Sequence, residues 1–194
     1  MPGPRRSAVA LAAALTVLAA GCGGDDGLPD DLGYEPAERA VVRIAESERG
    51  EPLQLSGTSA EGEEVDLAQL RGSVVVLNVW YATCPPCRRE APVLAKLSQE
   101  YADEGVRFVG VNVRNDSTEA VHAFQDQYDI AYPSIRDTDG RAQLALRGIV
   151  PTAPPNTLVL DAEGRVAAKA AGEVSEETLT ALVDEVLAGG GAAG

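Results

Sequence analysis

The chain has 194 residues, of which 45% are hydrophobic, and this size suits one globular domain with a buried core and short extensions. Its 16 Lys and Arg residues and 30 Asp and Glu residues give a formal net charge of −14. An acidic chain without a cluster of basic residues is not expected to bind nucleic acid.

The first 21 residues have the pattern of an export signal. Arg5 and Arg6 precede an uncharged, mostly apolar stretch, residues 8–20, which is too short to span a bilayer comfortably. This stretch runs into the sequence LAAGC, which resembles a bacterial lipobox and would make Cys22 the lipidated residue. We expect a lipoprotein signal peptide over residues 1–21. The alternative is an ordinary signal peptide followed by an unrelated cysteine.

The next segment, residues 22–50, is acidic and rich in Gly and Pro, so we expect a flexible tether. The folded domain is expected over residues 51–188, and a flexible tail over residues 189–194. If Cys22 carries lipid, Cys84 and Cys87 are the only cysteines left for chemistry. The export signal places them outside the cytosol, where disulfides persist.

The domain opens with strands. Residues 53–67 alternate apolar and polar side chains around a Gly-containing turn, which predicts a β-hairpin. Residues 73–80 are a continuous run rich in β-branched residues, as expected of a strand buried on both faces, and residues 106–113 form a similar run. A helix is expected between these two strands, directly after the cysteines.

Helices and strands also alternate in the second half. Residues 116–129 predict an amphipathic helix, with Asp116 as its cap and Glu119 completing a capping box. A short strand at residues 132–135 and a hairpin around residues 162–164 follow. Ser175 is expected to cap a final helix. The alternation indicates the α/β class, with a central mixed sheet flanked by helices on both faces.

The sequence NVWYATCPPCRREAP, residues 78–92, places two cysteines between a buried strand and a helix. Pro85 and Pro86 suit the first turn of a helix, where an N–H group is not needed. The free N–H groups and the helix dipole would then favour a thiolate on Cys84. Cys87 would lie one turn into the helix, so the spacing predicts a solvent-side nucleophile and a buried resolving thiol.

Other interpretations of the two cysteines remain open at this point. A C-x-x-C pair is also half of a zinc site, but a second pair of ligands is not found. The only histidine, His122, is expected at the surface of the amphipathic helix. Two small residues in a turn are the third possibility.

The strand–WYATCPPC–helix unit resembles the thioredoxin superfamily. The longer stretch at residues 78–92 resembles the membrane-anchored, extracytoplasmic TlpA/ResA-type thiol-disulfide oxidoreductases, and the likeness extends over roughly residues 51–188. The resemblance implies a thioredoxin-like fold with an N-terminal β-hairpin and an extra helix and strand at residues 117–135. It also implies reductive tasks such as cytochrome c maturation.

Carried over to this chain, the resemblance makes Cys84 the nucleophile and Cys87 the resolving cysteine. Glu90 matches a glutamate that tunes the proton chemistry of the pair. Asn78 lies where thioredoxins carry a buried aspartate, a role that Glu90 is expected to take over. The redox-active disulfide Cys84–Cys87 is then the only redox group, with neither a metal nor another cofactor.

The active-site sequence departs from the family pattern at the residue before the nucleophile. Thr83 stands where the superfamily usually has tryptophan, and Trp80 and Tyr81 lie upstream instead. We count Trp80, Thr83, Pro85 and Pro86 as the vicinity of the active site, although Trp80 also suits core packing.

A second departure concerns the cis-proline that faces the disulfide in this fold. The candidates are Pro151, Pro154 and Pro155. Alignment on NTLVLD selects Pro155, which makes Pro154 the preceding residue and removes an N–H that the family usually offers to a partner. We therefore expect Pro154 and Pro155 to bind substrate with one main-chain hydrogen bond fewer, and Pro154→Thr to strengthen trapping of mixed disulfides.

Together these features predict a monomer anchored by lipid on Cys22 to the outer face of a bacterial cytoplasmic membrane. It would reduce disulfides of exported proteins, such as apocytochrome c, and be re-reduced by a membrane thiol-transferring donor. The alternatives are a disulfide oxidase or isomerase, and a non-enzymatic metal or copper carrier that uses the same two thiols.

Overall fold

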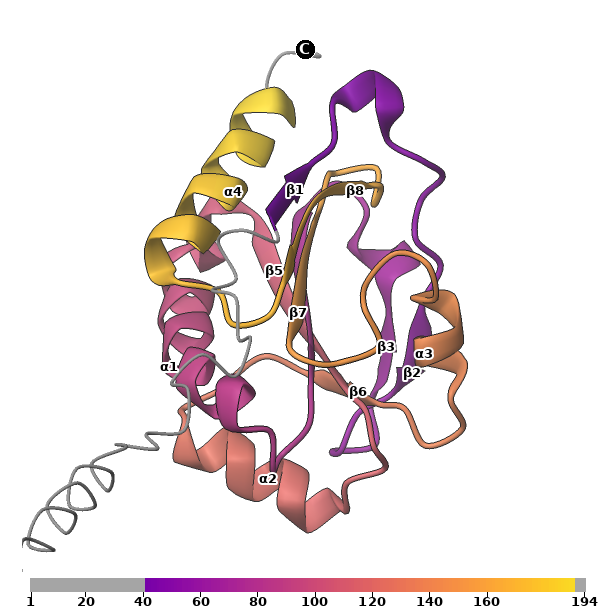
Figure 1. Ribbon diagram of the computed structural model, residues 1–194, viewed down its shortest axis with the longest axis vertical. Helices are drawn as coiled ribbons and strands as arrows, with labels where there is room; N and C mark the ends of the chain where they lie inside the picture. The colour runs from indigo at the N-terminus through magenta and orange to yellow at the C-terminus, as the bar shows by residue number, and fades with distance from the viewer. Residues whose placement is uncertain (1–40, 191–194) are drawn as a thin grey trace, which may run out of the picture. The chain divides into compact units, whose positions relative to one another are not determined.

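The computed structural model describes residues 41–190, which form a six-stranded sheet with helices around it (Figure 1). The strand order is β1-β8-β7-β4-β5-β6. The strands are β1 (Val41–Arg43), β4 (Val74–Trp80), β5 (Val106–Asn112), β6 (Ser134–Arg136), β7 (Asn156–Leu160) and β8 (Val166–Ala171). β4 pairs in parallel with β5 and antiparallel with β7, so the sheet is mixed, as predicted. This architecture confirms the predicted α/β class with a central mixed sheet.

Two helices cover one face of the sheet. α1 (Pro85–Glu100) and α4 (Glu176–Gly190) lie together on the left side of the sheet in Figure 1. Their buried side chains meet those of β4, β5 and β7 in one apolar cluster, which includes Leu94, Leu97, Leu179, Leu182 and Val183. Ser175 accepts a hydrogen bond from the Thr178 N–H at 3.2 Å, which confirms it as the cap of α4.

The opposite face is covered by smaller elements. β2 (Ser56–Thr58) and β3 (Glu64–Asp66) form the predicted hairpin as a separate two-stranded sheet, and a bridge between Ser59 and Ile135 joins it to β6. The short helix α3 (Arg141–Ala145) was not predicted. Its first N–H groups are bound by the buried Asp137, which accepts from Ala142 at 2.9 Å and from Gln143 at 3.0 Å.

Helix α2 (Thr118–Gln127) closes the end of the sheet beside the start of α1 (Figure 1). The predicted cap was wrong by one residue. The Ser117 hydroxyl accepts from the Ala120 N–H at 3.2 Å, whereas Asp116 binds elsewhere. Val121 and Phe124 are buried by α2 against Trp80 and both cysteines. The extra helix and strand therefore form one wall of the region around the cysteines.

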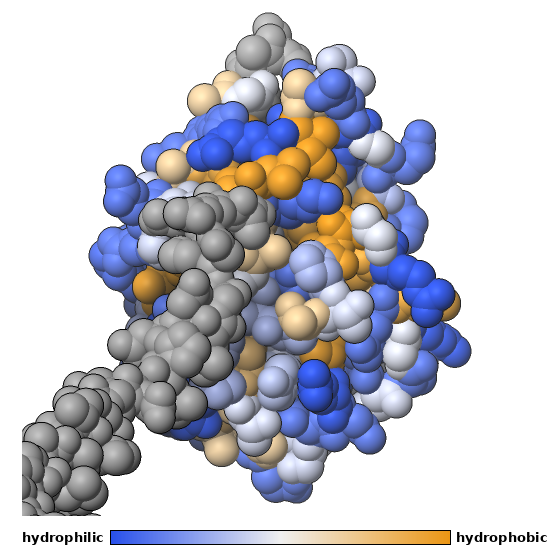
Figure 2. All heavy atoms as spheres, in the orientation of Figure 1, coloured by the Kyte–Doolittle hydropathy of each residue, from blue (hydrophilic) through white to orange (hydrophobic). Residues whose placement is uncertain are grey.

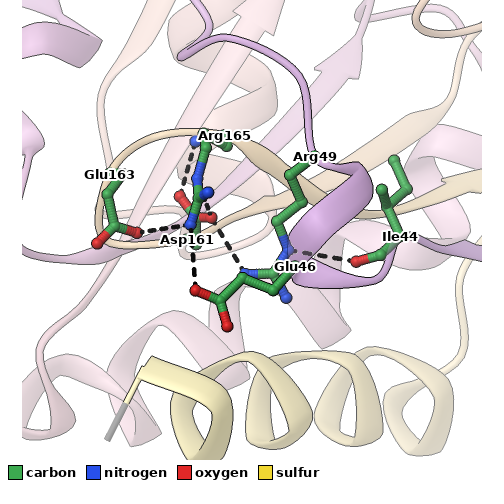
Figure 3. A network of polar contacts seen from close by, with 6 residues as sticks. All are labelled: Ile44, Glu46, Arg49, Asp161, Glu163 and Arg165. Atoms are coloured by element: carbon green, nitrogen blue, oxygen red, sulfur yellow. Dashed lines mark hydrogen bonds and ion pairs between the residues drawn. The ribbon is translucent and has the colours of Figure 1, made fainter. Parts of the chain in front are cut away.

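The domain begins earlier than the sequence indicated. β1 pairs antiparallel with β8, so residues 41–43 belong to the sheet and not to a tether. A short 3-10 helix, Glu46–Glu48, follows, and Figure 3 shows how residues 44–49 are held to the β7–β8 turn. The buried Asp161 accepts from Arg49 Nη1 at 3.1 Å and from Arg165 Nε at 2.9 Å.

The other end of the domain also differs from the prediction. α4 continues through Gly190, so residues 189 and 190 are helical and not part of a tail. The predicted signal peptide, Cys22 and the tether up to residue 40 lie outside the described residues.

The face drawn in Figure 2 is mostly hydrophilic, and hydrophobic surface gathers in the area that β1 and β8 occupy in Figure 1. Of the described large hydrophobic side chains, only Val42 and Leu144 are exposed, at 45% and 62%. Among residues 41–190, no helix has both the length and the apolar character needed to cross a membrane.

Candidate active site

Cys84 and Cys87 form a disulfide at the junction of β4 and α1. Cys84 is the N-cap of α1, and its Sγ accepts a hydrogen bond from the Cys87 N–H at 3.2 Å. Pro85 and Pro86 occupy the first two helical positions, as predicted. In the reduced protein, the same N–H and the positive end of the helix dipole would stabilise a thiolate on Cys84.

Both cysteines are buried, which corrects the prediction that Cys84 faces solvent. Cys84 is 0% exposed and Cys87 is 2% exposed. Part of the cover comes from the wall formed by α2, where Phe124 stacks on Trp80 with ring centroids 4.2 Å apart. Trp80 is therefore both a core residue and a neighbour of the disulfide. In contrast, Thr83 and Pro85 on either side of Cys84 are exposed.

The loop before β7 lies against Cys84. The peptide bond between Pro154 and Pro155 is cis, at the position expected from the sequence, and the Pro154 carbonyl oxygen lies 4.0 Å from Cys84 Sγ. Asn156, which the sequence analysis did not single out, braces this loop. Its Nδ2 donates to the carbonyl oxygens of Pro151 and Ala153 at 3.1 and 3.0 Å.

Glu90 is a buried carboxyl on the same helix as the cysteines, one turn beyond Cys87. It is 1% exposed, and its two oxygens accept from Asn78 Nδ2 at 2.7 Å and from the Val174 N–H at 3.0 Å. Burial raises the pKa of Glu90 to about 8, although both hydrogen bonds lower it, and the nearby Glu173 raises it further. A carboxyl with this pKa is well matched to exchanging a proton with a thiol.

The sequence and the fold both match known proteins. The Redoxin family model matches residues 44–187. The thiol-disulfide oxidoreductase ResA of Halalkalibacterium halodurans is 31% identical over 148 residues, which cover 76% of this chain and 80% of that protein. The chain belongs to the TlpA/ResA-type thioredoxin-like thiol-disulfide oxidoreductases.

Solved structures agree with this family. A secreted thiol-disulfide isomerase from Corynebacterium glutamicum has a TM-score of 0.72 and 27% identity, covering 80% of this chain and 96% of that one. A DsbF homologue from Corynebacterium diphtheriae has a TM-score of 0.66 and 29% identity, covering 78% and 96%. The relatives are named both as oxidoreductases and as an isomerase, so the family alone does not give the direction of electron flow.

Asp116 is a residue at the site of this oxidoreductase whose role the sequence did not indicate. Its Oδ2 accepts from the Ala82 N–H at 2.6 Å and from Asn112 Nδ2 at 2.9 Å. The carboxylate therefore ties the segment after β5 to the loop two residues before Cys84. A possible signal in the sequence was the spacing of Asn112 and Asp116, at and just beyond the end of a buried strand.

Arg88 is exposed and braces the loop before α1. It donates to the Ala82 carbonyl at 3.2 Å and to Gln127 Oε1 at 3.1 Å, and its guanidinium lies over the Tyr128 ring at 5.8 Å. The neighbouring Arg89 is paired with Glu173 at 2.7 Å. Together these contacts join the start of α1 to α2 and to the loop before α4.

Among residues 41–190, no three His, Cys, Asp or Glu residues are arranged to hold a metal ion. His122 is half-buried and faces Glu61, with 3.4 Å between Nε2 and Oε1. The site is thus assembled from the disulfide, the cis-proline loop and the Glu90 carboxyl.

Proposed function

We propose that this oxidoreductase reduces disulfides of exported partner proteins, such as apocytochrome c. The observation that carries the proposal is the arrangement at the start of α1. There the Cys84 sulfur meets a helix N–H, the carbonyl before the cis-proline lies 4.0 Å away, and a buried carboxyl follows one turn beyond the resolving cysteine.

In the first step, the reduced protein attacks with the Cys84 thiolate. A bond forms between Cys84 Sγ and one partner sulfur, the partner disulfide breaks, and the other partner sulfur leaves as a thiolate that takes up a proton. The Cys87 N–H and the start of α1 favour the attacking thiolate.

In the second step, Cys87 loses its proton and attacks Cys84 Sγ. The mixed disulfide breaks, the second partner sulfur leaves as a thiol after protonation, and the Cys84–Cys87 disulfide forms. Two electrons have passed to the partner. Glu90 accepts the Cys87 proton in its ionised form: with a pKa of about 8, the carboxyl is ionised in a minority of molecules at neutral pH, and this carboxylate competes well with a thiol.

Another dithiol must then reduce the Cys84–Cys87 disulfide, and we assign this role to a membrane thiol-transferring donor. The export signal and the lipobox-like LAAGC favour a domain outside the cytoplasmic membrane, held by lipid on Cys22. The C. glutamicum relative is described as secreted, which supports an extracytoplasmic site of action.

A redox titration of the chain from Gly23 onward tests the direction of transfer. The protein is equilibrated in graded thiol/disulfide buffers, and free thiols are counted by the mass added with maleimide. A midpoint below about −220 mV supports the reductase, because thioredoxin lies near −270 mV, whereas a midpoint near −120 mV would indicate an oxidant. Cys84→Ser and Cys87→Ser serve as controls that cannot form the internal disulfide.

The isomerase from C. glutamicum favours disulfide isomerisation as a second candidate. Recovery of activity from a scrambled disulfide protein, without added reductant, would identify that activity.

Two further experiments test the anchor and the docking loop. Cys22→Ser is expected to move the protein from the membrane fraction to the soluble fraction. Pro154→Thr, which restores a backbone N–H beside the cis-proline, is expected to increase the yield of trapped mixed disulfide. An unchanged yield would show that the missing donor does not weaken docking.

A further inference from the structure

A buried threonine links the cis-proline loop to the centre of the site. Thr157 lies two residues beyond Pro155 on β7, directly opposite Asn78 on β4. Asn78 Nδ2 donates to Thr157 Oγ1 at 3.1 Å and to Glu90 Oε1 at 2.7 Å. All three residues are at most 2% exposed, so water does not replace these contacts. The orientation of the Asn78 amide therefore depends on Thr157.

The other oxygen of Glu90 is connected to the same loop by a second route. The Pro155 carbonyl accepts from the Gly172 N–H at 2.9 Å. Two residues later, the Val174 N–H donates to Glu90 Oε2 at 3.0 Å. Each oxygen of the Glu90 carboxyl thus accepts from a donor that is linked to the chain just after Pro154. Asn78 is linked through Thr157, and Val174 through the hydrogen bond between Gly172 and Pro155.

The held carboxyl is sensitive to small changes in these donors. Among the described contacts, no cation pairs with Glu90. Glu173 raises the pKa of Glu90, and Glu90 raises the pKa of Tyr132. Both neighbours become anionic when they ionise, so neither stabilises the Glu90 carboxylate. Two neutral N–H donors are then the main support for the ionised form. Because hydrogen bonds to an ion are strong in a buried site, a small misalignment of either donor changes the balance between its protonated and ionised forms.

We propose that Thr157 and Asn78 are positioning residues that connect the cis-proline loop to the Glu90 carboxyl, so that a partner docked on this loop changes how readily Glu90 accepts a proton. The inference rests on the proposed function, in which Glu90 takes the proton of Cys87. Its consequence is timing: the carboxyl becomes the better acceptor when a mixed disulfide is present, which is when Cys87 must lose its proton.

The test compares Thr157→Val, which keeps the shape but removes the hydroxyl, with Thr157→Ser, which keeps the hydroxyl. The titration of Glu90 is followed by its carboxyl ¹³C signal, assigned with Glu90→Gln, in the full chain. The free disulfide form is compared with a Cys87→Ser form that carries a short single-cysteine peptide on Cys84. Unfolding in urea confirms that each variant is folded, and Thr157→Ala replaces the valine variant if that one is not.

For the native residue at 157, the peptide is expected to raise the titration midpoint of Glu90 by at least half a pH unit, about a threefold increase in proton affinity, and a fall would contradict the proposal. Thr157→Ser should keep this shift and Thr157→Val should lose most of it. An equal shift in the valine variant, or no shift with threonine, would overturn the inference.

The rate of the resolving step separates this inference from the proposed function. If Glu90→Gln resolves a mixed disulfide as fast as the unaltered chain, the role of Glu90 fails and the inference fails with it. If Glu90→Gln is at least about tenfold slower while Thr157→Val keeps the shift, Glu90 accepts the proton but the link to the loop is wrong.

Discussion

Two buried carboxyl groups at opposite parts of the domain are held in contrasting ways. Asp161, in the β7–β8 turn, is 3% exposed and accepts hydrogen bonds from the guanidinium groups of Arg49 and Arg165. Glu90, beside the disulfide, is 1% exposed and accepts only from an amide and a backbone N–H. Burial is thus nearly equal, but only one of the two has a cation.

This difference assigns the two groups to different tasks. A buried carboxylate between two guanidinium groups fastens segments together, as Asp161 does for residues 44–49 and the hairpin (Figure 3). A buried carboxyl without a cation is costly to ionise, and its raised pKa suits the proton acceptor that we propose for Glu90. The hydrogen-bond partners of each carboxyl, more than its burial, therefore decide whether it has a structural or a chemical role.

The largest effect is expected when Glu90 is forced to ionise. Its pKa in the folded protein, about 8, lies above its ordinary value of 4.5, so the folded state binds more protons between these pH values. The free energy of unfolding should therefore fall as pH rises through this window, by about 3 to 5 kcal/mol, and level off above it. Urea unfolding of the disulfide form across this range measures the effect.

Glu90→Gln is the matched variant for this experiment, because it has no proton to lose. At acid pH, the free energy of unfolding of Glu90→Gln should be only slightly lower than that of the unaltered chain. At alkaline pH it should be higher. Parallel pH profiles for both proteins would show that Glu90 ionises as easily as a surface carboxyl.

Removing the charge of Asp161 should have the next largest effect. Asp161→Asn leaves Arg49 and Arg165 without their shared acceptor, and we expect a loss of about 3 kcal/mol in the free energy of unfolding. The rate of disulfide exchange in the folded protein should be unchanged. A double-mutant cycle with Arg49→Gln isolates the pair. If Asp161→Asn changed the rate of disulfide exchange but not the free energy of unfolding, Asp161 would not be a purely structural residue.

Placing a second carboxyl beside Glu90 sharpens the comparison. In Asn78→Asp, two carboxyl groups would lie within hydrogen-bonding distance and share one proton, so the pair should titrate in two separated steps. The upper step should lie at least about one unit above the titration of Glu90 in the unaltered chain. Carboxyl ¹³C titration measures both steps, and a single unshifted step would contradict the expected contact.

The smallest effect is expected at an exposed ion pair. Arg43 on β1 and Glu185 on α4 are 2.7 Å apart, with side chains 50% and 58% exposed. Arg43→Gln should change the free energy of unfolding by about 0.3 kcal/mol, since solvent screens such pairs. If Arg43→Gln lowered the free energy of unfolding as much as Asp161→Asn, the presence of a cation, rather than the burial of the ion pair, would determine the stabilisation.

The sequence predicted the parts of the site that depend on neighbouring residues. The continuous apolar run of β4, the proline pair and the cysteine spacing each act locally, so the strand, the helix start and the disulfide position followed from them. Glu90 and Pro155 were located by family resemblance, since no local rule separates a buried glutamate from a surface one.

What the sequence did not reveal depends on distant contacts. Asp116 and Ser117 are both residue types that cap helices, and only Asp116 has a glutamate three residues on. Asp116 instead accepts from the Ala82 N–H, and Ser117 caps the helix. β1 is only three residues long and is a strand because β8 pairs with it. The cover over Cys84 comes partly from α2, and the Asn78–Thr157 contact joins residues 79 positions apart.

The two outer strands of the sheet have a consequence for solubility. β1 and β6 are three residues long, and the Ser59–Ile135 bridge places the β2–β3 hairpin against β6. Exposed strand edges pair readily with extended chains, and short or covered edges prevent this. If this oxidoreductase acts on exported chains, as we propose, it meets partners that are not fully folded and gains from such edges. It can hold a partner by one sulfur bond and release it, without adding the partner's backbone to its own sheet and nucleating an aggregate.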